Sequence, residues 1–543
     1  MRIAAALLGL VCSTHAFAAT FVVTRTDDPV PGACLRTDCS LREAINAANA
    51  RAGRDTVQLG AATYLLSRSG ADGGFTSDSG PLWVQDDVDI VGVGRTRTRI
   101  RWTHLLLRDA DDAVLAFWSA SPTPLDARVS DLAISHGRGD SGGCVQFAKS
   151  ASRYAMQRVD VEHCRAIEGG GLSVLGSELM LTDVEVRDNV ATYDGGGIKL
   201  HYDAILRGGD LAIHGNRAGR DGGGLIAKQM MLIGPANTMV IAEGGMKIAA
   251  NEAGRNGGGV AVTGDMGLSI FGNHQLRIAQ NTAAAEGGGL WRGPRFVAVQ
   301  QQPLLVWNTQ VEGNLAYSGG GIAAQGRLQL SGVEVRDNTT SGGDGGGVFM
   351  AELTGEAAIL ASSFTGNVAR QGGGIHARCH SVGLQNVSLQ GNQAIDGAAA
   401  WLPGTAFLTH VTVNAHAGRA LRFPYDTACA SINQFARIEN SLVLSSCVSG
   451  HGAVTSGGGN QFGPSASACP RLAGVDQLQA SDAVFGLSLG SFGGEFTVTG
   501  WNSDGMPRPQ RDFIPASSGT CLASDVRGAT RSDGACDAGA FEQ

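Results

Sequence analysis

A glycine triplet that returns at a nearly regular spacing is the feature that most limits how this chain can fold. Between Glu168 and Ile375 it occurs eight times, each time followed at once by Leu, Ile or Val. Its first glycines are Gly169, Gly195, Gly222, Gly257, Gly287, Gly319, Gly345 and Gly372. The gaps of 26 to 35 residues are long enough for two or three short strands and too short for separate domains. Each unit must therefore stack on its neighbours, as in a solenoid.

An asparagine five to seven residues before each of these triplets except the first gives the repeat a second anchor. These asparagines are Asn189, Asn216, Asn251, Asn281, Asn314, Asn338 and Asn367, and Asn392 precedes a degenerate ninth copy at 397–400. Cys164 takes this position before Gly169, and residues 141–145 look like a partial copy one period earlier. Because asparagine tolerates left-handed turns, we expect a column of amides that hydrogen-bond along the stack.

Within one period the apolar residues alternate with other residues, which is the periodicity of strands. The first full unit shows this at Leu172, Val174, Leu179, Leu181, Val184 and Val186. No helical pattern of ten or more residues is present to form a crossover, so strands of successive units must pair in parallel. The repeat therefore predicts an all-β, single-stranded parallel β-helix with coils about 4.8 Å apart.

Composition supports an ordered solenoid and excludes one class of partner. Gly accounts for 80 of 543 residues, Pro for only 15, and the apolar fraction is 43%. These values place the glycines in ordered turns, and a chain of this length can bury a continuous core. The formal charge of −8 argues against a nucleic-acid partner, because binding phosphates requires surplus basic charge.

The first residues have the pattern of a secretory signal peptide. Met1-Arg2 is followed by the apolar run 3–12 and by Ala16-Phe17-Ala18, so we expect cleavage after Ala18. No later run is long enough to span a bilayer. Removing Cys12 leaves ten cysteines, an even number suited to an oxidising compartment. We expect a secreted or periplasmic protein, or one held at the cell surface, and a monomer.

A short helix is predicted before the repeats. Ser40-Leu41-Arg42-Glu43 is a capping-box sequence, and Leu41, Ala44, Ile45 and Ala48 form one apolar stripe. Because the open end of a β-helix would aggregate, we expect this helix to lie over the first coil. Cys34 and Cys39 flank its entry and are expected to be bonded to each other.

Two short motifs resemble those of exported bacterial β-helix proteins. Residues 39–45, Cys-Ser-Leu-Arg-Glu-Ala-Ile, resemble the signature of the CSLREA domain. The end of the chain is similar to the choice-of-anchor Q region, through Asn440-Ser441-Leu442-Val443, Cys521, Arg527-Gly528 and 536–542. The resemblance implies an exported right-handed, pectin-lyase-like β-helix, which also agrees with the usual hand of parallel crossovers. It further implies the disulfides Cys447–Cys469 and Cys521–Cys536, and leaves Cys144, Cys164, Cys379 and Cys429 unassigned.

These arguments divide the chain into four parts. They are a signal peptide (1–18), an N-terminal CSLREA-type cap (19–54), the β-helix with its glycine repeats (55–445), and terminal coils with a disulfide-bonded C-terminal cap (446–543). The closing motif is followed only by Gln543, without the anchoring tail often found in the family. We therefore expect any attachment to a surface to be non-covalent.

Residues at one offset from the triplet should form a column on the surface. The residue after the first inward position is Trp291, Phe349 or Trp401 in three alternate units, and His376 in another. With Arg378 nearby, such a row predicts binding of an extended, acidic glycan through ring faces and charge-assisted hydrogen bonds. The alternative is that loops from neighbouring turns cover the rings.

A column of acidic residues stands just before the triplets. It contains Glu168, Asp194 and Asp221 in consecutive units and Glu286, Asp344 and Asp396 later. Stacked carboxylates must raise one another's pKa, accept hydrogen bonds from glycine N–H groups, or share a cation. A Ca²⁺ site at Glu168, Asp194 and Asp221 is one hypothesis, although the glycine-rich calcium repeat motif is absent. No other cofactor is expected.

Catalysis is the alternative to recognition. A polysaccharide lyase needs a cation and a basic proton acceptor, and Lys199, His201, Lys228, Asp194 and Asp221 lie in adjacent units. A hydrolase needs two carboxylates flanking the scissile bond. Asp86-Asp87 and Gly450-His451-Gly452 each resemble fragments of pectin-degrading hydrolases, but they lie at opposite ends of the repeats, so no spacing distinctive of those enzymes is present. Arg138-Gly139-Asp140 spells an integrin-binding tripeptide, which is weak evidence. The sequence therefore favours a surface or recognition protein for an extracellular or envelope polysaccharide, with a lyase or hydrolase as the alternative.

Overall fold

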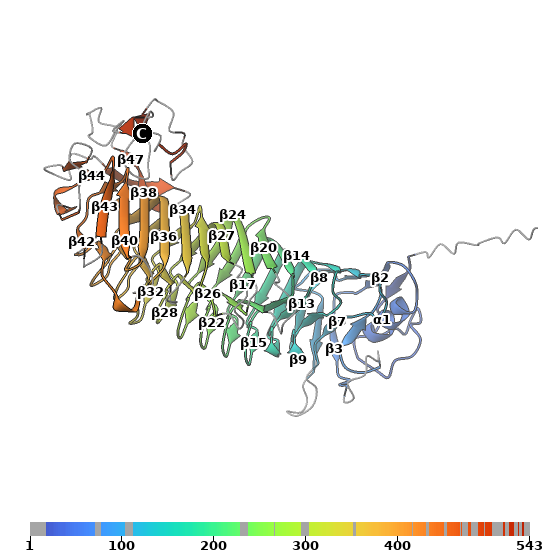
Figure 1. Ribbon diagram of the computed structural model, residues 1–543. Coiled ribbons are helices and arrows are strands. Elements are labelled where there is room, and N and C mark those ends of the chain that lie inside the picture. Colours follow the sequence, from blue (N-terminus) through green and yellow to red (C-terminus); the bar gives the residue numbers. More distant parts are fainter. Residues whose placement is uncertain are drawn as a thin grey trace, which may run out of the picture.

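The protein is a right-handed parallel β-helix, elongated along one axis, with its helical cap at one end and the last coils at the other (Figure 1). The computed structural model describes residues 18–70, 78–103, 112–228, 237–264, 267–294, 303–350, 355–414, 416, 418–429, 434–449, 453–466, 468–469 and 476–478, and short pieces at 487–492, 495–501, 514–515, 521–525, 530 and 535–536. The predicted signal peptide therefore lies, except for Ala18, outside the described residues.

Strands that follow the glycine turns form a 14-stranded parallel sheet, here called the triplet sheet. Its strands are β4 (Leu82–Val84), β7 (Leu115–Phe117), β10 (Val145–Phe147), β13 (Leu172–Leu175), β16 (Ile198–His201), β19 (Leu225–Lys228), β23 (Val260–Thr263), β26 (Leu290–Arg292), β29 (Ile322–Ala324), β33 (Val348–Met350), β35 (Ile375–Ala377), β37 (Ala400–Trp401), β39 (Leu421–Phe423) and β42 (Cys447–Ser449). Leu172 pairs with Ile198, and Ile198 with Leu225. Equal offsets from the triplet therefore share one column, as the repeat predicted.

Two further sheets complete the coil. The long sheet has 23 described strands and includes β5 (Val88–Val91), β8 (Asp126–Ser135), β11 (Arg153–Glu162), β14 (Glu178–Arg187), β17 (Ile205–His214), β24 (Gly267–Ala279), β27 (Leu304–Glu312), β34 (Glu356–Thr365), β36 (Ser381–Gln390) and β38 (Thr405–Asn414). The short sheet has eight strands, from β9 (Arg138–Ser141) to β32 (Thr339–Thr340). The side chains facing inward from the sheets make one continuous apolar core.

The asparagine column is an internal ladder of hydrogen bonds. The Asn189 amide donates from Nδ2 to the Val161 carbonyl and to Asn216 Oδ1, both at 3.0 Å. Asn216 repeats this with Val186 and Asn251, and the pattern continues to Asn392. Asn189 and Asn281 are fully buried. These bonds satisfy the buried carbonyls at one corner of every coil, so the predicted amide column is confirmed.

The glycine triplets are required by backbone geometry. The first glycine is in the left-handed region, with φ of 66° at Gly169 and 71° at Gly195. A Cβ added to the second glycine, Gly170, would lie 2.3 Å from the carbonyl oxygen of Gly196 in the next coil. Only glycine therefore fits both positions without strain or clash.

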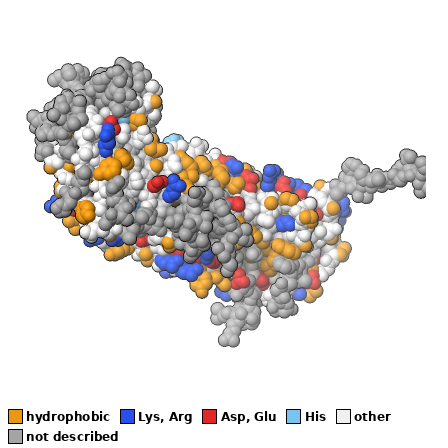
Figure 2. Space-filling model, viewed as in Figure 1, with side chains coloured by type: hydrophobic (Ala, Val, Ile, Leu, Met, Phe, Trp, Pro, Cys, Tyr) orange, Lys and Arg blue, Asp and Glu red, His pale blue; other side chains and the backbone are white. Residues whose placement is uncertain are grey.

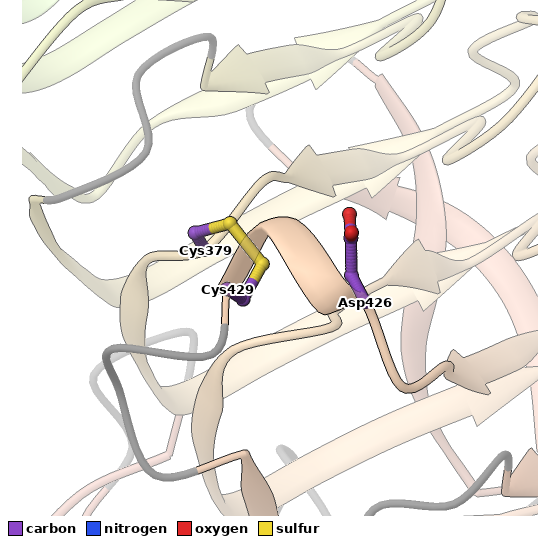
Figure 3. Close-up of side chains that lie close together, drawn as sticks. All are labelled: Cys379, Asp426 and Cys429. Carbon is purple, nitrogen blue, oxygen red and sulfur yellow. A yellow bond between two sulfur atoms is a disulfide. The ribbon is translucent and has the colours of Figure 1, made fainter.

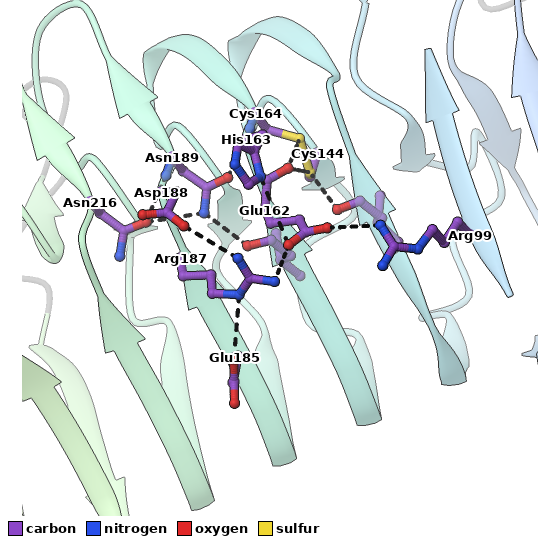
Figure 4. A network of polar contacts seen from close by, with 12 residues as sticks. Arg99, Cys144, Glu162, His163, Cys164, Glu185, Arg187, Asp188, Asn189 and Asn216 are labelled. Carbon is purple, nitrogen blue, oxygen red and sulfur yellow. Dashed lines mark hydrogen bonds and ion pairs between the residues drawn. A yellow bond between two sulfur atoms is a disulfide. The ribbon is translucent and has the colours of Figure 1, made fainter. Parts of the chain in front are cut away.

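A second corner bends the ten-residue strands of the long sheet. Asp131, Arg158, Asp183 and Asp210 occupy equivalent positions in β8, β11, β14 and β17, and each has φ between 52° and 60°. Ion pairs follow the outer surface beyond this corner (Figure 4). Glu162 lies 3.6 Å from Arg99 and also pairs with Arg187, which contacts Glu185 and Asp188. Charges of both signs are thus interspersed here, as on the face seen in Figure 2.

The N-terminal end is closed by α1 (Leu41–Asn49), the only α-helix in the described residues. Ser40 and Glu43 form the predicted capping box, and Leu41, Ala44, Ile45 and Ala48 are buried. Arg42 is buried as well and pairs with Asp28 at 2.8 Å. The first strand, β1 (Thr20–Val22), pairs in parallel with β2 (Asp55–Gln58), so the cap is built onto the solenoid itself.

Five disulfides tie down the chain. They include the three expected pairs, Cys34–Cys39, Cys447–Cys469 and Cys521–Cys536. The two pairs left open by the sequence are Cys144–Cys164, between neighbouring coils, and Cys379–Cys429. This many disulfides fits a protein of an oxidising compartment.

Candidate functional site

The predicted ligand-binding residues do share one column on the outer side of the triplet sheet. This outer column consists of Ser173, Lys199, Ile226, Ala261, Trp291, Ala323, Phe349, His376, Trp401 and Arg422, each paired in register with the next. Arg378 lies two residues beyond His376, just after the end of β35. The structure thus brings together rings that are separated by more than a hundred residues of sequence.

Two of the rings are less accessible than an open binding face requires. Trp291 is only 5% exposed and His376 only 3%. Trp291 packs against Ile226, Ala261 and Ala323, and its indole N–H donates to Glu286 Oε2 at 3.0 Å. The expectation that these two side chains form an exposed surface is therefore wrong. Trp291 is buried because its column neighbours Ala261 and Ala323 are small, whereas His376 is buried between the rings of Phe349 and Trp401.

The later part of the column is a stack of rings. His376 lies on Trp401 with ring centroids 4.4 Å apart and an interplanar angle of 6°, and Phe349 contacts His376 at 5.4 Å with its ring tilted by 42°. Phe349 and Trp401 remain half-buried, so each keeps part of its surface accessible. Burial, with the nearby charges of Arg378 and Arg370, lowers the pKa of His376 to about 3. The imidazole is therefore neutral near pH 7 and stacks as an uncharged ring.

Arginines surround this ring stack. Arg422 continues the column after Trp401, and its Nε lies 3.2 Å from Asp396. Arg370 pairs with Asp344 at 2.8 Å, and Arg419 lies 3.8 Å from Asp396. Arg378 is exposed and makes no ion pair within the part of the chain that the structure describes. The stack is thus bordered by cations, one of which has its charge uncompensated.

The candidate catalytic residues lie at the other part of the column, in a polar cluster. Lys199 Nζ lies 2.5 Å from Glu168 Oε2. Lys228 Nζ pairs with the other oxygen of Glu168 and lies 2.8 Å from Asp194 Oδ2. The ammonium of Lys228 therefore bridges carboxylates of two successive coils. Arg220 reaches Asp194 from the opposite side at 3.1 Å.

Hydroxyl groups extend the cluster to His201. Lys199 Nζ is 3.3 Å from Ser141 Oγ, which is 2.9 Å from Ser173 Oγ. Ser173 Oγ in turn is 3.4 Å from His201 Nε2. Sequence reasoning missed both serines. The repeat register gives a signal for both. Ser141 occupies the position of the acidic column in its unit, and Ser173 occupies the position of Lys199 one unit earlier.

Burial is the main influence on the titration of this cluster. It lowers the pKa of His201 to about 3, and the charges of Lys199 and Lys228 add to the effect. Burial also lowers the pKa of Lys199, although Glu168 opposes it. For Lys228, hydrogen bonds with Asp194 and Glu168 outweigh burial and raise the pKa. The two lysines likewise hold the pKa of Glu168 below its ordinary value despite burial.

The negative charges of the acidic column are balanced in a way that none of the sequence hypotheses proposed. Asp221 accepts hydrogen bonds from Arg255 Nε at 2.9 Å and from the backbone and amide N–H groups of Asn256. The glycine N–H groups instead donate to backbone carbonyls of the next coil, as Gly195 does to Asp221 at 2.8 Å. The glycine N–H groups therefore do not need the carboxylates, which pair with lysines and arginines or, at Glu286, with the Trp291 indole. Signals for this pairing were available, since Arg220 and Arg255 each stand just before the acidic position.

The calcium hypothesis gains no support from these contacts. Lys228 lies between Glu168 and Asp194, where a shared cation would have to sit. The one cluster of potential metal ligands in the described residues is Cys379, Asp426 and Cys429. Figure 3 shows that the two sulfur atoms of this cluster are joined in a disulfide, so neither is a thiolate ligand. Calcium binding stays a prediction.

Two other sequence features have plain structural places. Arg138-Gly139-Asp140 lies in β9 and pairs in parallel with the next strand of the short sheet, so it is extended backbone within a sheet. Asp87 accepts a hydrogen bond from the Asp126 backbone, and Asp86 from the Asp87 backbone. Gly450-His451-Gly452 lies outside the described residues.

Comparisons with known proteins give a fold likeness and no family. No protein-family model matches the chain, and no curated protein matches it. A solved structure, the A-module of the mannuronan C-5 epimerase AlgE6 of Azotobacter vinelandii, is similar with 14% identity and a TM-score of 0.34 over 78% of this chain and 94% of that one. At this identity and TM-score the likeness carries no argument about activity. None of the described helices has the length and apolar character needed to cross a bilayer.

Proposed function

We propose that this protein binds an extended, acidic glycan along the C-terminal half of the outer column, from Phe349 to Arg422. The observation that carries the proposal is the ring stack Phe349, His376 and Trp401 on three successive rungs, bordered by the exposed Arg378. Aromatic faces hold the apolar faces of sugar rings, and guanidinium groups hold carboxylates through paired hydrogen bonds. Phe349 and Trp401 lie two strand spacings apart, about 10 Å. That spacing suits a disaccharide interval, so the two aromatic rings would hold alternate sugars of an extended polysaccharide.

The proposal rests on the accessible members of the column. Trp291 and His376 are buried, so they support the neighbouring rings and do not touch the ligand. Phe349, Trp401, Arg378 and Arg422 are the residues that would contact it. Because Arg422 is already paired with Asp396, Arg378 supplies most of the attraction for an anionic sugar.

The test is binding of polygalacturonate, alginate and neutral dextran to the purified protein, measured by affinity electrophoresis. The double variant Phe349→Ala, Trp401→Ala should weaken binding of the acidic polymers about tenfold or more, since each ring contributes about 1 kcal/mol. The matched control is Trp307→Ala, which removes a half-buried tryptophan stacked on Phe271 in the long sheet. Equal binding by the double variant and the wild type would refute the proposal, as would equal retention in dextran.

Cleavage of the glycan is a second candidate, favoured by the neutral imidazole of His201 in the polar cluster. In a β-elimination the base removes the proton beside the uronate carboxyl group, the C–O bond to the leaving sugar breaks, and a C=C bond forms. His201 is neutral and Lys228 is cationic, which are the two roles required. His201 is however buried and faces Ser173, so binding is better supported than cleavage. Ultraviolet absorbance of unsaturated products during incubation with polygalacturonate, for wild type and His201→Gln, decides between them.

A further inference from the structure

A hollow on the long sheet, away from the outer column, has the shape and chemistry of a second ligand site. It has a volume of about 430 Å³ and spans β5, β8, β11 and β14. Its lining side chains are Asp89, Val91, Arg128, Ser130, Ala155, Gln157, Met180 and Thr182, with Val129 and Met156 beneath. Sites for small ligands typically measure about 300–1,000 Å³. The hollow is therefore large enough for a short oligosaccharide.

Two neighbouring rows of side chains on successive strands line the hollow. Ala155 and Met180 follow Arg128 in one row and give it an apolar surface, and Met180 is 39% exposed. Ser130, Gln157 and Thr182 lie on adjacent rungs in register and supply hydroxyl and amide groups. A sugar ring has one apolar face and a rim of hydroxyl groups, so this arrangement complements it.

Most of the charged groups around the hollow are paired with one another. Arg54 pairs with Asp89 at 2.9 Å and with Asp126 at 3.0 Å at one end, and Arg207 pairs with Glu178 at 2.5 Å at the other. Along the bent corner, Arg158 pairs with Asp131 at 2.6 Å and Arg95 with Asp183 at 2.9 Å.

Arg128 lines the hollow, is exposed, and makes no hydrogen bond or ion pair from its guanidinium group among the described residues, although its charge lowers the pKa of the nearby Asp126. Its N–H donors therefore face the hollow without a protein acceptor, which favours an anionic ligand. The fixed ion pairs at the ends limit its length to the three strand spacings between β5 and β14, about 14 Å.

We infer that this hollow binds a short, carboxylate-bearing oligosaccharide, with the carboxylate on Arg128 and a sugar face on Met180. The site lies on a different sheet from the outer column, so it does not depend on the function proposed there. Repeated uronate units would also allow one protein to hold two segments of polymer, or two chains.

The methyl group of Met180 reports directly on the hollow. The chain has ten methionines, so methyl NMR of protein labelled with ¹³C-methyl methionine gives a small set of signals, and Met180→Leu identifies the relevant one. The probes are trigalacturonic acid and maltotriose, each titrated to millimolar concentration. Met350, which faces the core beneath the triplet sheet, is an internal control in the same spectrum.

We expect trigalacturonic acid to shift the Met180 signal in a saturable way and to leave Met350 unchanged. Arg128→Gln should weaken this binding about tenfold, whereas Arg165→Gln, an exposed arginine on the short sheet, should not. The same shift should persist in the Phe349→Ala, Trp401→Ala variant, which separates this site from the outer column. An unmoved Met180 signal, an equal response to maltotriose, or unchanged affinity in Arg128→Gln would each overturn the inference.

Discussion

The two parts of the outer column use the same repeat register for opposite chemistry. Around Lys199 the column is polar, and the ammonium groups of Lys199 and Lys228 are held by Glu168 and Asp194. From Phe349 to Trp401 it is a stack of rings whose bordering carboxylates are paired with arginines. The backbone turns and strand pairing are alike in both parts. The fold therefore fixes where a side chain lies, and the residue at each rung decides what that rung does.

The largest expected effect comes from breaking the polar part. Glu168→Ala leaves two largely buried ammonium groups with one carboxylate, so we expect a loss of about 3 to 5 kcal/mol in the free energy of unfolding. Denaturant unfolding followed by circular dichroism measures it. Glu252→Ala, which removes an exposed carboxylate paired with Arg217, should cost about 1 kcal/mol or less. Similar losses for both variants would show that the cluster is not buried as described.

Acid should weaken both parts through their histidines. The folded-state pKa values of His201 and His376 are about 3, below the ordinary 6.5, because burial disfavours the charged ring. The unfolded chain therefore binds more protons between pH 6.5 and 3, and stability falls as the pH drops through this window. Each histidine contributes a loss of up to roughly 3 kcal/mol between pH 6.5 and 4.5.

Unfolding midpoints at these two pH values, for wild type, His201→Gln and His376→Gln, measure the effect. Each substitution should flatten the pH dependence, and the exposed His163→Gln serves as the control. A wild-type stability that does not change between pH 6.5 and 4.5 would contradict the assignment of two buried, neutral rings.

The stability of the ring stack from Phe349 to Trp401 should depend on packing and not on salt concentration. Trp401→Ala removes a half-buried ring stacked on His376, and we expect a loss of about 1 to 2 kcal/mol. This loss should be the same at low and high ionic strength, because no charge is removed. A strong salt dependence would mean that the part is held by ion pairs, like the part around Lys199.

The smallest effect is expected at the edge of the polar part. Arg220 pairs with Asp194 and lies 4.2 Å over the Tyr193 ring, but it is well exposed. Arg220→Ala should cost about 1 kcal/mol, and the cost should fall as salt is added. If the cost exceeded that of Glu168→Ala, the lysine bridge would not be the main support of the cluster.

The sequence was sufficient to predict the coil and the columns. The glycine triplets require left-handed turns and close backbone contact, and the asparagines stack as a ladder. Both patterns therefore predict the local backbone geometry directly. The capping box at Ser40 and Glu43 is equally local, and it is present as predicted.

The solvent exposure of individual side chains in these columns could not be predicted in the same way. The burial of Trp291 depends on Ile226, Ala261 and Ala323, which lie in other coils. The sequence alone does not show that these residues pack against the indole ring. The pairing of the acidic column with arginines depends on side chains that reach from the following coil. The hollow at Arg128 is lined by side chains of four strands, and alternation within a single strand gives no signal for it.

The most direct measurement is an experimental structure of the protein with a bound oligogalacturonate. The account predicts sugar rings against Phe349 and Trp401 and a carboxylate within hydrogen-bond distance of the Arg378 guanidinium group. A saccharide bound instead over Lys199 and Lys228, with the ring stack empty, would contradict it.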